Sequence, residues 1–242
     1  MSKLYTTGKP KVLIVDVERA QVGLLCLQLK DDYVTISAHS GKEALELVKT
    51  QVPDLILLDL MLPESDGYEV CSILKNDPIF KFIPIIVISG FFERQNKIKA
   101  TQCGADDFIS KPIDIFELKT RIKSLIRIKK NYDALQESER NFRVLVENTL
   151  DGIFILNSEG KILTANAAVG KMLDIRLDEI IGTNFNRYLT PESMAFARKN
   201  LKNTLSNKVG YLNAYEVIPS KGEKIWIEAL GNKITYDDEP AD

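Results

Sequence analysis

The chain has 242 residues, 45% of them hydrophobic, which is more than one domain of ordinary size requires, so we expect two domains. Its 32 basic and 34 acidic residues leave a net charge of −2, which favours neither nucleic acid nor a membrane surface as a partner. No apolar stretch approaches the ~20 residues of a membrane span, and residues 1–10 lack a signal-peptide core, so we expect a cytoplasmic location.

Strand-like and helix-like segments alternate over the first half of the chain. Strands are expected at 11–16, 33–37, 54–59, 84–89 and 106–110, and helices near 18–30, 41–50, 66–76, 92–102 and 113–130. This alternation favours right-handed βαβ crossovers and a parallel sheet. The runs 54–59 and 84–89 are almost continuous in Ile, Leu and Val, as in strands covered on both faces, so we expect them at the centre of the sheet.

Polar residues end four of these strand-like runs. They are Asp16, Asp59, Ser89 and Lys111, the last of which is followed by Pro112. The carboxyl ends of parallel strands meet at one edge of the sheet, where open α/β sheets bind their ligands. We therefore expect two acids, a hydroxyl and a lysine to lie close together.

This set and its order resemble the receiver domain of two-component response regulators, over about the first half of the chain. The resemblance implies a flavodoxin-like, doubly wound, five-stranded parallel sheet. It implies that Asp59 accepts a phosphoryl group from a histidine kinase or a phosphotransfer protein. Lys111 would neutralise one phosphoryl oxygen and Ser89 would donate a hydrogen bond to another. Phe108 would be the aromatic switch residue that rearranges together with Ser89.

A magnesium ion is expected beside the phosphoacceptor, because the transferred oxygens need positive charge around them. Asp16, Asp59 and the backbone carbonyl of Met61, with several waters, suit its preference for oxygen ligands. Receivers generally carry two adjacent acids after the first strand, and the resemblance implies that the second is a direct metal ligand. Here that position is Val17, whose isopropyl group cannot coordinate a metal. Glu18 is a replacement candidate, but the dipole of the following helix also favours an acid there, and we prefer that explanation.

The loss of one ligand should weaken magnesium binding and leaves two interpretations open. The chain is either a phosphorylated receiver or a metal-weak pseudo-receiver that acts as a protein-binding scaffold. A flavodoxin-like flavin carrier is a third possibility because that fold has the same strand order. The placement of Asp59 and Lys111 argues against the flavin carrier.

A long apolar stripe with steps of three and four follows Pro112. It contains Leu118, Ile122, Leu125, Ile128, Tyr132, Leu135, Phe142 and Val146, with Glu139 in one gap. We expect its first part, to about residue 126, to pack on the receiver's own sheet. The rest has highly charged surroundings, which favour a narrow coiled-coil seam, and we expect a parallel homodimer through it.

The pattern changes from Arg140 onward. It indicates a helix, two strands joined at Ser158-Glu-Gly160, a helix start after Asn166, a helix from Pro191 to about residue 207, and strands at 209–219 and 223–235. This order resembles an α+β PAS domain. We expect a receiver at 10–130, a helical linker at 131–148 and a PAS-like domain at 149–242.

The last strand of a PAS sheet is not evident, because residues 237–242 read as the turn that would precede it. We therefore expect a fragment of a longer protein, with no complete enzyme domain of its own. Architecture alone favours a histidine kinase as the missing output domain, and a cyclic-dinucleotide enzyme next.

The only histidine, His39, and all three cysteines, Cys26, Cys71 and Cys103, lie in the first half of the chain. An axial haem histidine and a flavin-adduct cysteine are thus unavailable to the PAS-like half, so neither haem nor covalent flavin is expected there. The cysteines are odd in number and widely spaced, which predicts free thiols rather than disulfides or a metal site. His39 is expected to be an exposed loop residue.

Overall fold

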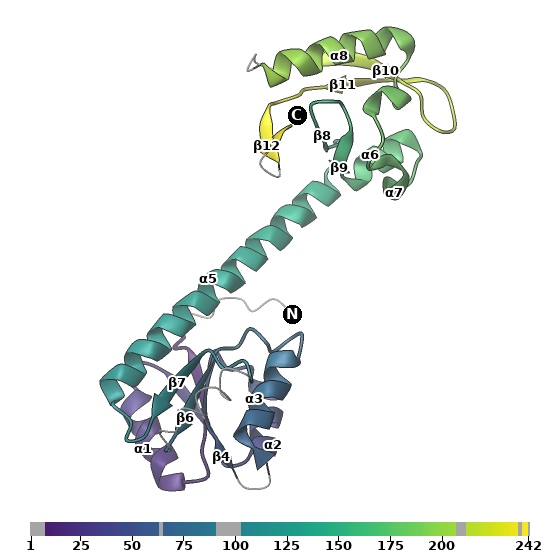
Figure 1. Cartoon of the computed structure of the whole chain (residues 1–242). Helices are drawn as coiled ribbons and strands as arrows, with labels where there is room; N and C mark the ends of the chain where they lie inside the picture. Colours follow the sequence, from purple (N-terminus) through teal and green to yellow (C-terminus); the bar gives the residue numbers. More distant parts are fainter. Residues whose placement is uncertain (1–7, 63–64, 91–102, 207–211, 237–238, 242) are drawn as a thin grey trace. The chain divides into compact units, whose positions relative to one another are not determined.

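The computed structural model describes residues 8–62, 65–90, 103–206, 212–236 and 239–241 (Figure 1). The chain divides into two compact units, Met1–Gln136 and Glu137–Asp242. Among the helices of these described ranges, none is both long enough and apolar enough to cross a membrane.

A five-stranded parallel sheet forms the centre of the first unit. Its strands are β1 (Lys11–Val15), β2 (Val34–Ala38), β3 (Leu55–Asp59), β6 (Ile85–Ser89) and β7 (Asp107–Ser110). Their order is β2-β1-β3-β6-β7, which confirms the predicted flavodoxin-like topology. Every residue of β3 and β6 is buried, as expected for central strands covered on both faces.

Helices cover both faces of this sheet. They are α1 (Arg19–Leu29), α2 (Gly41–Gln51), α3 (Gly67–Asn76) and the first part of α5 (Ile115–Asn148). Side chains alternate along each strand, so Leu13 and Val15 join a core with α2 and α3, whereas Val12 and Ile14 join a core with α1 and α5. The short strands β4 (Met61–Leu62) and β5 (Ser65–Asp66) pair just after β3. The helix expected at 92–102 lies outside the described residues.

Helix α5 is one continuous helix of 34 residues. Leu118, Ile122 and Ile126 are buried against the sheet, as expected for the first part of the stripe. Farther along, the ring of Tyr132 stacks on Phe82, with 4.5 Å between the ring centroids. This stack holds α5 to the rest of the first unit at a point beyond the part of the helix that packs on the sheet.

The second unit contains short strands and helices. They are β8 (Phe154–Leu156), β9 (Ile162–Ala165), α6 (Ala167–Leu173), α7 (Leu177–Ile180), the 3₁₀ helix η1 (Phe185–Tyr188), α8 (Pro191–Leu205), β10 (Asn213–Val217), β11 (Ile225–Ala229), β12 (Ile234–Tyr236) and β13 (Glu239–Ala241). The predicted pairs β8–β9 and β10–β11 are both antiparallel. Gly160, in the first of these turns, has a φ of 81°, a conformation that favours glycine.

Two expectations for the second unit are wrong. The run 223–235 is not one strand, because it is interrupted between β11 and β12. Residues 239–241 are not part of a turn but form β13, which pairs antiparallel with β12. Alternating hydrophobicity continues across such an interruption, so the sequence pattern alone does not reveal it.

Candidate functional site

Asp16 and Asp59 lie together at the carboxyl edge of the sheet, because Asp16 directly follows β1, Asp59 is the last residue of β3, and these two strands are neighbours. Each is only 3% exposed. The Nζ atom of Lys111 lies 3.0 Å from Asp16 Oδ2 and 2.5 Å from Asp59 Oδ2. One ammonium group therefore bridges two buried carboxylates that are 43 positions apart in the sequence.

Backbone N–H groups hold the other two carboxylate oxygens. The N–H of Glu18 donates to Asp16 Oδ1 at 2.8 Å, and the N–H of Met61 donates to Asp59 Oδ1 at 2.9 Å. Each bond joins a side chain to the backbone two residues farther along, which fixes the side-chain orientation locally. All four carboxylate oxygens thus have a hydrogen-bond donor.

The electrostatics of the site follow from this burial and pairing. Burial is the largest influence on Asp59 and raises its pKa; the charge of Asp16 adds to the increase, and the bonds from Lys111 and Met61 only partly offset it. For Lys111, burial opposes the charged form, but the hydrogen bonds to Asp59 and Asp16 outweigh it and raise the pKa of the ammonium group. Lys111 therefore stays protonated throughout the physiological range.

Ser89 and Phe108 belong to the same edge and the strand beside it. Ser89 ends β6, between β3 and β7, and is 3% exposed. Its carbonyl accepts a hydrogen bond from the N–H of Lys111 at 2.8 Å, which fixes the backbone at the lysine. Phe108 is half-buried on β7 and packs against the core that contains α2 and α3. The four polar residues predicted from the strand ends therefore converge on one edge.

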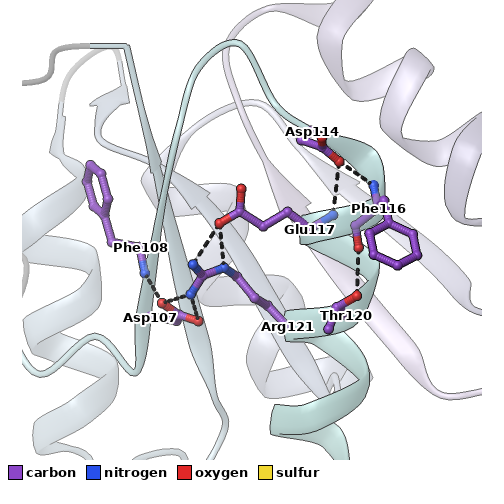
Figure 2. A network of polar contacts seen from close by, with 7 residues as sticks. All are labelled: Asp107, Phe108, Asp114, Phe116, Glu117, Thr120 and Arg121. Atoms are coloured by element: carbon purple, nitrogen blue, oxygen red, sulfur yellow. Dashed lines mark hydrogen bonds and ion pairs between the residues drawn. The ribbon is translucent and has the colours of Figure 1, made fainter.

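A polar network attaches β7 to the start of α5 (Figure 2). Arg121 Nη1 lies 2.6 Å from both carboxylate oxygens of Asp107, and Arg121 also donates to Glu117 at 2.9 and 2.7 Å. Asp114 caps α5 by accepting from the N–H groups of Phe116 and Glu117. The side chain of Phe108 points away from this network (Figure 2). The strand that leads to Lys111 is thus held to α5 on one face.

Two further residues contribute to the edge, and sequence reasoning assigned neither a role. A Cβ atom on Gly67 would lie 2.5 Å from Asp59 O, so only glycine allows α3 to begin this close to the end of β3. His39 Nδ1 lies 3.1 Å from Asp16 O, and the side chain is half-buried, so the expectation of an exposed loop residue is wrong. Its position directly after β2, beside β1, is the signal that could have located it.

The comparisons with known proteins agree with this geometry. The response regulator receiver domain model matches residues 12–123, and the PAS fold model matches residues 140–240. The chain is a receiver domain followed by a PAS domain. The expected family and domain order are therefore confirmed.

Relatives of the receiver are found among curated proteins and solved structures. Response regulator PleD of Caulobacter vibrioides is 40% identical over 134 residues, which are 55% of this chain and 30% of that protein. The alkaline phosphatase synthesis transcriptional regulatory protein PhoP of Bacillus subtilis is 39% identical over 118 residues, 48% of each chain. The signal receiver domain of a putative LuxO repressor protein from Vibrio parahaemolyticus superposes with a TM-score of 0.50 at 27% identity, covering 53% of this chain and 98% of that one. The chain spans half or less of the length of both curated relatives.

The donors predicted for magnesium are all oxygen atoms, but Val17 occupies the position at which the receiver resemblance implies a further acid. Asp16, Asp59 and the Met61 carbonyl are oxygen donors, as the ion prefers. Val17 is 47% exposed and offers only hydrocarbon. Glu18 is the N-cap residue of α1, and its backbone N–H, rather than its carboxylate, bonds to Asp16. Within the ranges that the structure describes, no group of three or more His, Cys, Asp or Glu side chains could hold a metal.

Proposed function

We propose that Asp59 accepts a phosphoryl group and that the chain takes part in two-component signal transduction. The observation that carries the proposal is the Lys111 ammonium group, which bridges the buried carboxylates of Asp16 and Asp59 at 3.0 and 2.5 Å. A buried acid beside a fixed cation at the ligand-binding edge of the sheet supplies the nucleophile and part of the positive charge that phosphoryl transfer to a carboxylate requires.

The reaction forms a bond between an Asp59 oxygen and phosphorus, while the donor's leaving group departs with the electrons of its own bond to phosphorus. Lys111, already beside this carboxylate, neutralises charge on the phosphoryl oxygens as they arrive. The Ser89 hydroxyl, at the end of the neighbouring strand, donates to another phosphoryl oxygen. A magnesium ion held by Asp16, Asp59 and the Met61 carbonyl would add further positive charge around the transferred group.

The phosphodonor in this proposal is a histidine kinase or a phosphotransfer protein. Its docking surface is the outer side of α1, where Leu24 and Leu27 are exposed and where no residue from 19 to 29 is acidic. A cavity of about 230 Å³ lies beside this surface and is lined by Leu24, Lys111 and Ile113, among others. Lys111 lines the cavity and also contacts Asp59, so a donor helix docked there would lie beside the lysine that holds the phosphoacceptor.

The remaining parts of the proposal concern the longer protein. We propose that α5 mediates parallel homodimerisation and passes the signal to the PAS domain and to an output domain. A histidine kinase is the first choice for that output and a cyclic-dinucleotide enzyme the second, on domain architecture alone. We also propose a cytoplasmic location without nucleic-acid or membrane partners, which fractionation of cell extracts would test.

A second candidate function is a pseudo-receiver that acts only as a scaffold for protein binding. Val17 favours it, because this side chain replaces a metal-binding acid.

Intact mass after incubation with acetyl phosphate and magnesium separates the two candidates. Phosphorylation adds ~80 Da. Asp59→Asn should abolish the gain, whereas Asp31→Asn, a change of the same type at an exposed position, should preserve it. If the unmutated chain gains no mass at high magnesium, even with its own kinase, the scaffold function replaces the phosphoacceptor function.

A further inference from the structure

One line of apolar side chains on α5 is exposed. Ile128, Leu135 and Phe142 recur every seven residues and are 60%, 65% and 69% exposed, and Leu145, three positions farther, is 72% exposed. A seven-residue spacing keeps side chains on the line along which a helix packs against another helix. This line therefore has the spacing of a coiled-coil contact.

The molecule itself covers the neighbouring line of the predicted seam. In the first unit, Tyr132 stacks on Phe82 at 4.5 Å. In the second unit, Val146 is half-buried, and its carbonyl accepts a hydrogen bond from Asn166 Nδ2 at 2.8 Å. Tyr132 and Val146 thus pack within their own units, and the free contact line is displaced from the one that the sequence predicts.

We propose that a second copy of this chain covers the exposed line in parallel and in register, with six core positions. These are Ile128, Asn131, Leu135, Ser138, Phe142 and Leu145. The assignment rests on the self-association proposed above and specifies its contact face.

The two polar core residues decide the orientation. Parallel pairing places each residue opposite its own copy, so the Asn131 amides, which both donate and accept, can bond to each other. Antiparallel pairing over the full line would place Asn131 opposite Phe142 and Ser138 opposite Leu135. Each polar group would then be buried without a partner, which is unfavourable.

The residues flanking the core are compatible with parallel pairing. Their cross-helix pairs bring no like charges together: Arg127 with Tyr132, Ala134 with Glu139, and Asn141 with Val146. Glu139 lies beside the core rather than in it, and its Oε1 is 2.9 Å from Nη2 of Arg143 on the same helix. The interruption in the apolar stripe at Glu139 therefore falls outside the contact.

Sedimentation equilibrium of residues 1–242 tests the face. The double variant Leu135→Glu, Phe142→Glu should weaken the dimer at least ~100-fold, since it places charges in the centre of the contact. The matched control Val144→Glu changes an apolar residue that is 53% exposed on the same helix but off the line, and should remain dimeric. Circular dichroism checks that the variants stay folded.

Three results of this experiment would overturn the assignment. A dimer that survives both glutamates, or one lost with Val144→Glu, rejects the contact face and leaves self-association standing. If the unmutated chain sediments as a monomer well above micromolar concentration, the contact face and the self-association are both rejected. Phosphorylation of Asp59 is measured separately and is unaffected by either outcome.

Cross-linking tests the orientation. Ile128→Cys, in a chain carrying Cys26→Ser, Cys71→Ala and Cys103→Ser, should form an interchain disulfide under mild oxidation, because parallel pairing places the two copies of residue 128 opposite each other. In the antiparallel pair residue 128 faces Leu145, so the two thiols would be ~25 Å apart at 1.5 Å per residue. A dimer of this variant that fails to cross-link rejects the parallel arrangement.

Discussion

Val17→Asp should supply the anionic metal ligand that the receiver resemblance implies at this position. The side chain follows Asp16 directly and is 47% exposed, so a carboxylate can be placed there without disturbing the core. Two unit charges ~4 Å apart attract by ~1 kcal/mol even in bulk water, and a divalent ion doubles this to ~2 kcal/mol. Repulsion from Asp16 and Asp59, and their pairing with Lys111, reduce the gain. We therefore expect magnesium affinity to rise at least ~10-fold, or ~1.4 kcal/mol.

Isothermal titration of magnesium into both proteins measures this difference directly. Val17→Asn is the matched control, because it offers an oxygen of similar size without the charge and should produce a smaller increase. Asp59→Asn in the Val17→Asp background should weaken binding again, which locates the ion at the phosphoacceptor. A rise of less than ~10-fold for Val17→Asp would show that Val17 does not occupy a ligand position.

Three further predictions follow from single positions. Gly67→Ala should destabilise the fold by ~1–3 kcal/mol in urea unfolding, because its Cβ would meet the Asp59 carbonyl at 2.5 Å. Gly23→Ala, on α1 with nothing within 4 Å, should stabilise it by ~0.5–1 kcal/mol, and equal effects would refute the steric argument. Because burial raises the pKa of Asp59, the folded chain binds a proton at this carboxylate more tightly than the unfolded chain does. In buffer with a metal chelator, the contribution of Asp59 to the free energy of unfolding should therefore fall as pH rises above the ordinary carboxyl range. Unfolding midpoints measured against pH should lose this slope in Asp59→Asn, and an unchanged slope would assign it to other groups. Burial also raises the pKa of the Cys71 thiol, so Cys71 should react with an alkylating reagent more slowly than the half-buried Cys26. Alkylation of the native protein followed by peptide mass analysis measures both rates, and comparable rates would contradict the burial of Cys71.

Much of the first unit could be predicted from its sequence. Each strand is a short apolar run, and alternation with helices restricts the sheet to parallel strands in a right-handed order. Asp16, Asp59, Ser89 and Lys111 could be placed on one edge because each follows or ends such a run. The second unit was less predictable, since β11 and β12 continue one alternating pattern across an interruption that only pairing partners reveal.

Tertiary structure alone decided the contacts between distant residues. Hydrophobic periodicity places Lys111 and Asp16 at the same edge. Whether the ammonium group bridges both carboxylates depends on how segments of the chain pack together, since Lys111 and Asp16 are 95 positions apart in the sequence. The same applies to His39 and the carbonyl of Asp16. On α5 the sequence determines a long apolar stripe, and the stacking of Tyr132 on Phe82 helps to decide which part of it remains free. The hydrophobic periodicity of the sequence indicates which side chains share a helix face, whereas the partner of each face depends on the packing of the whole domain.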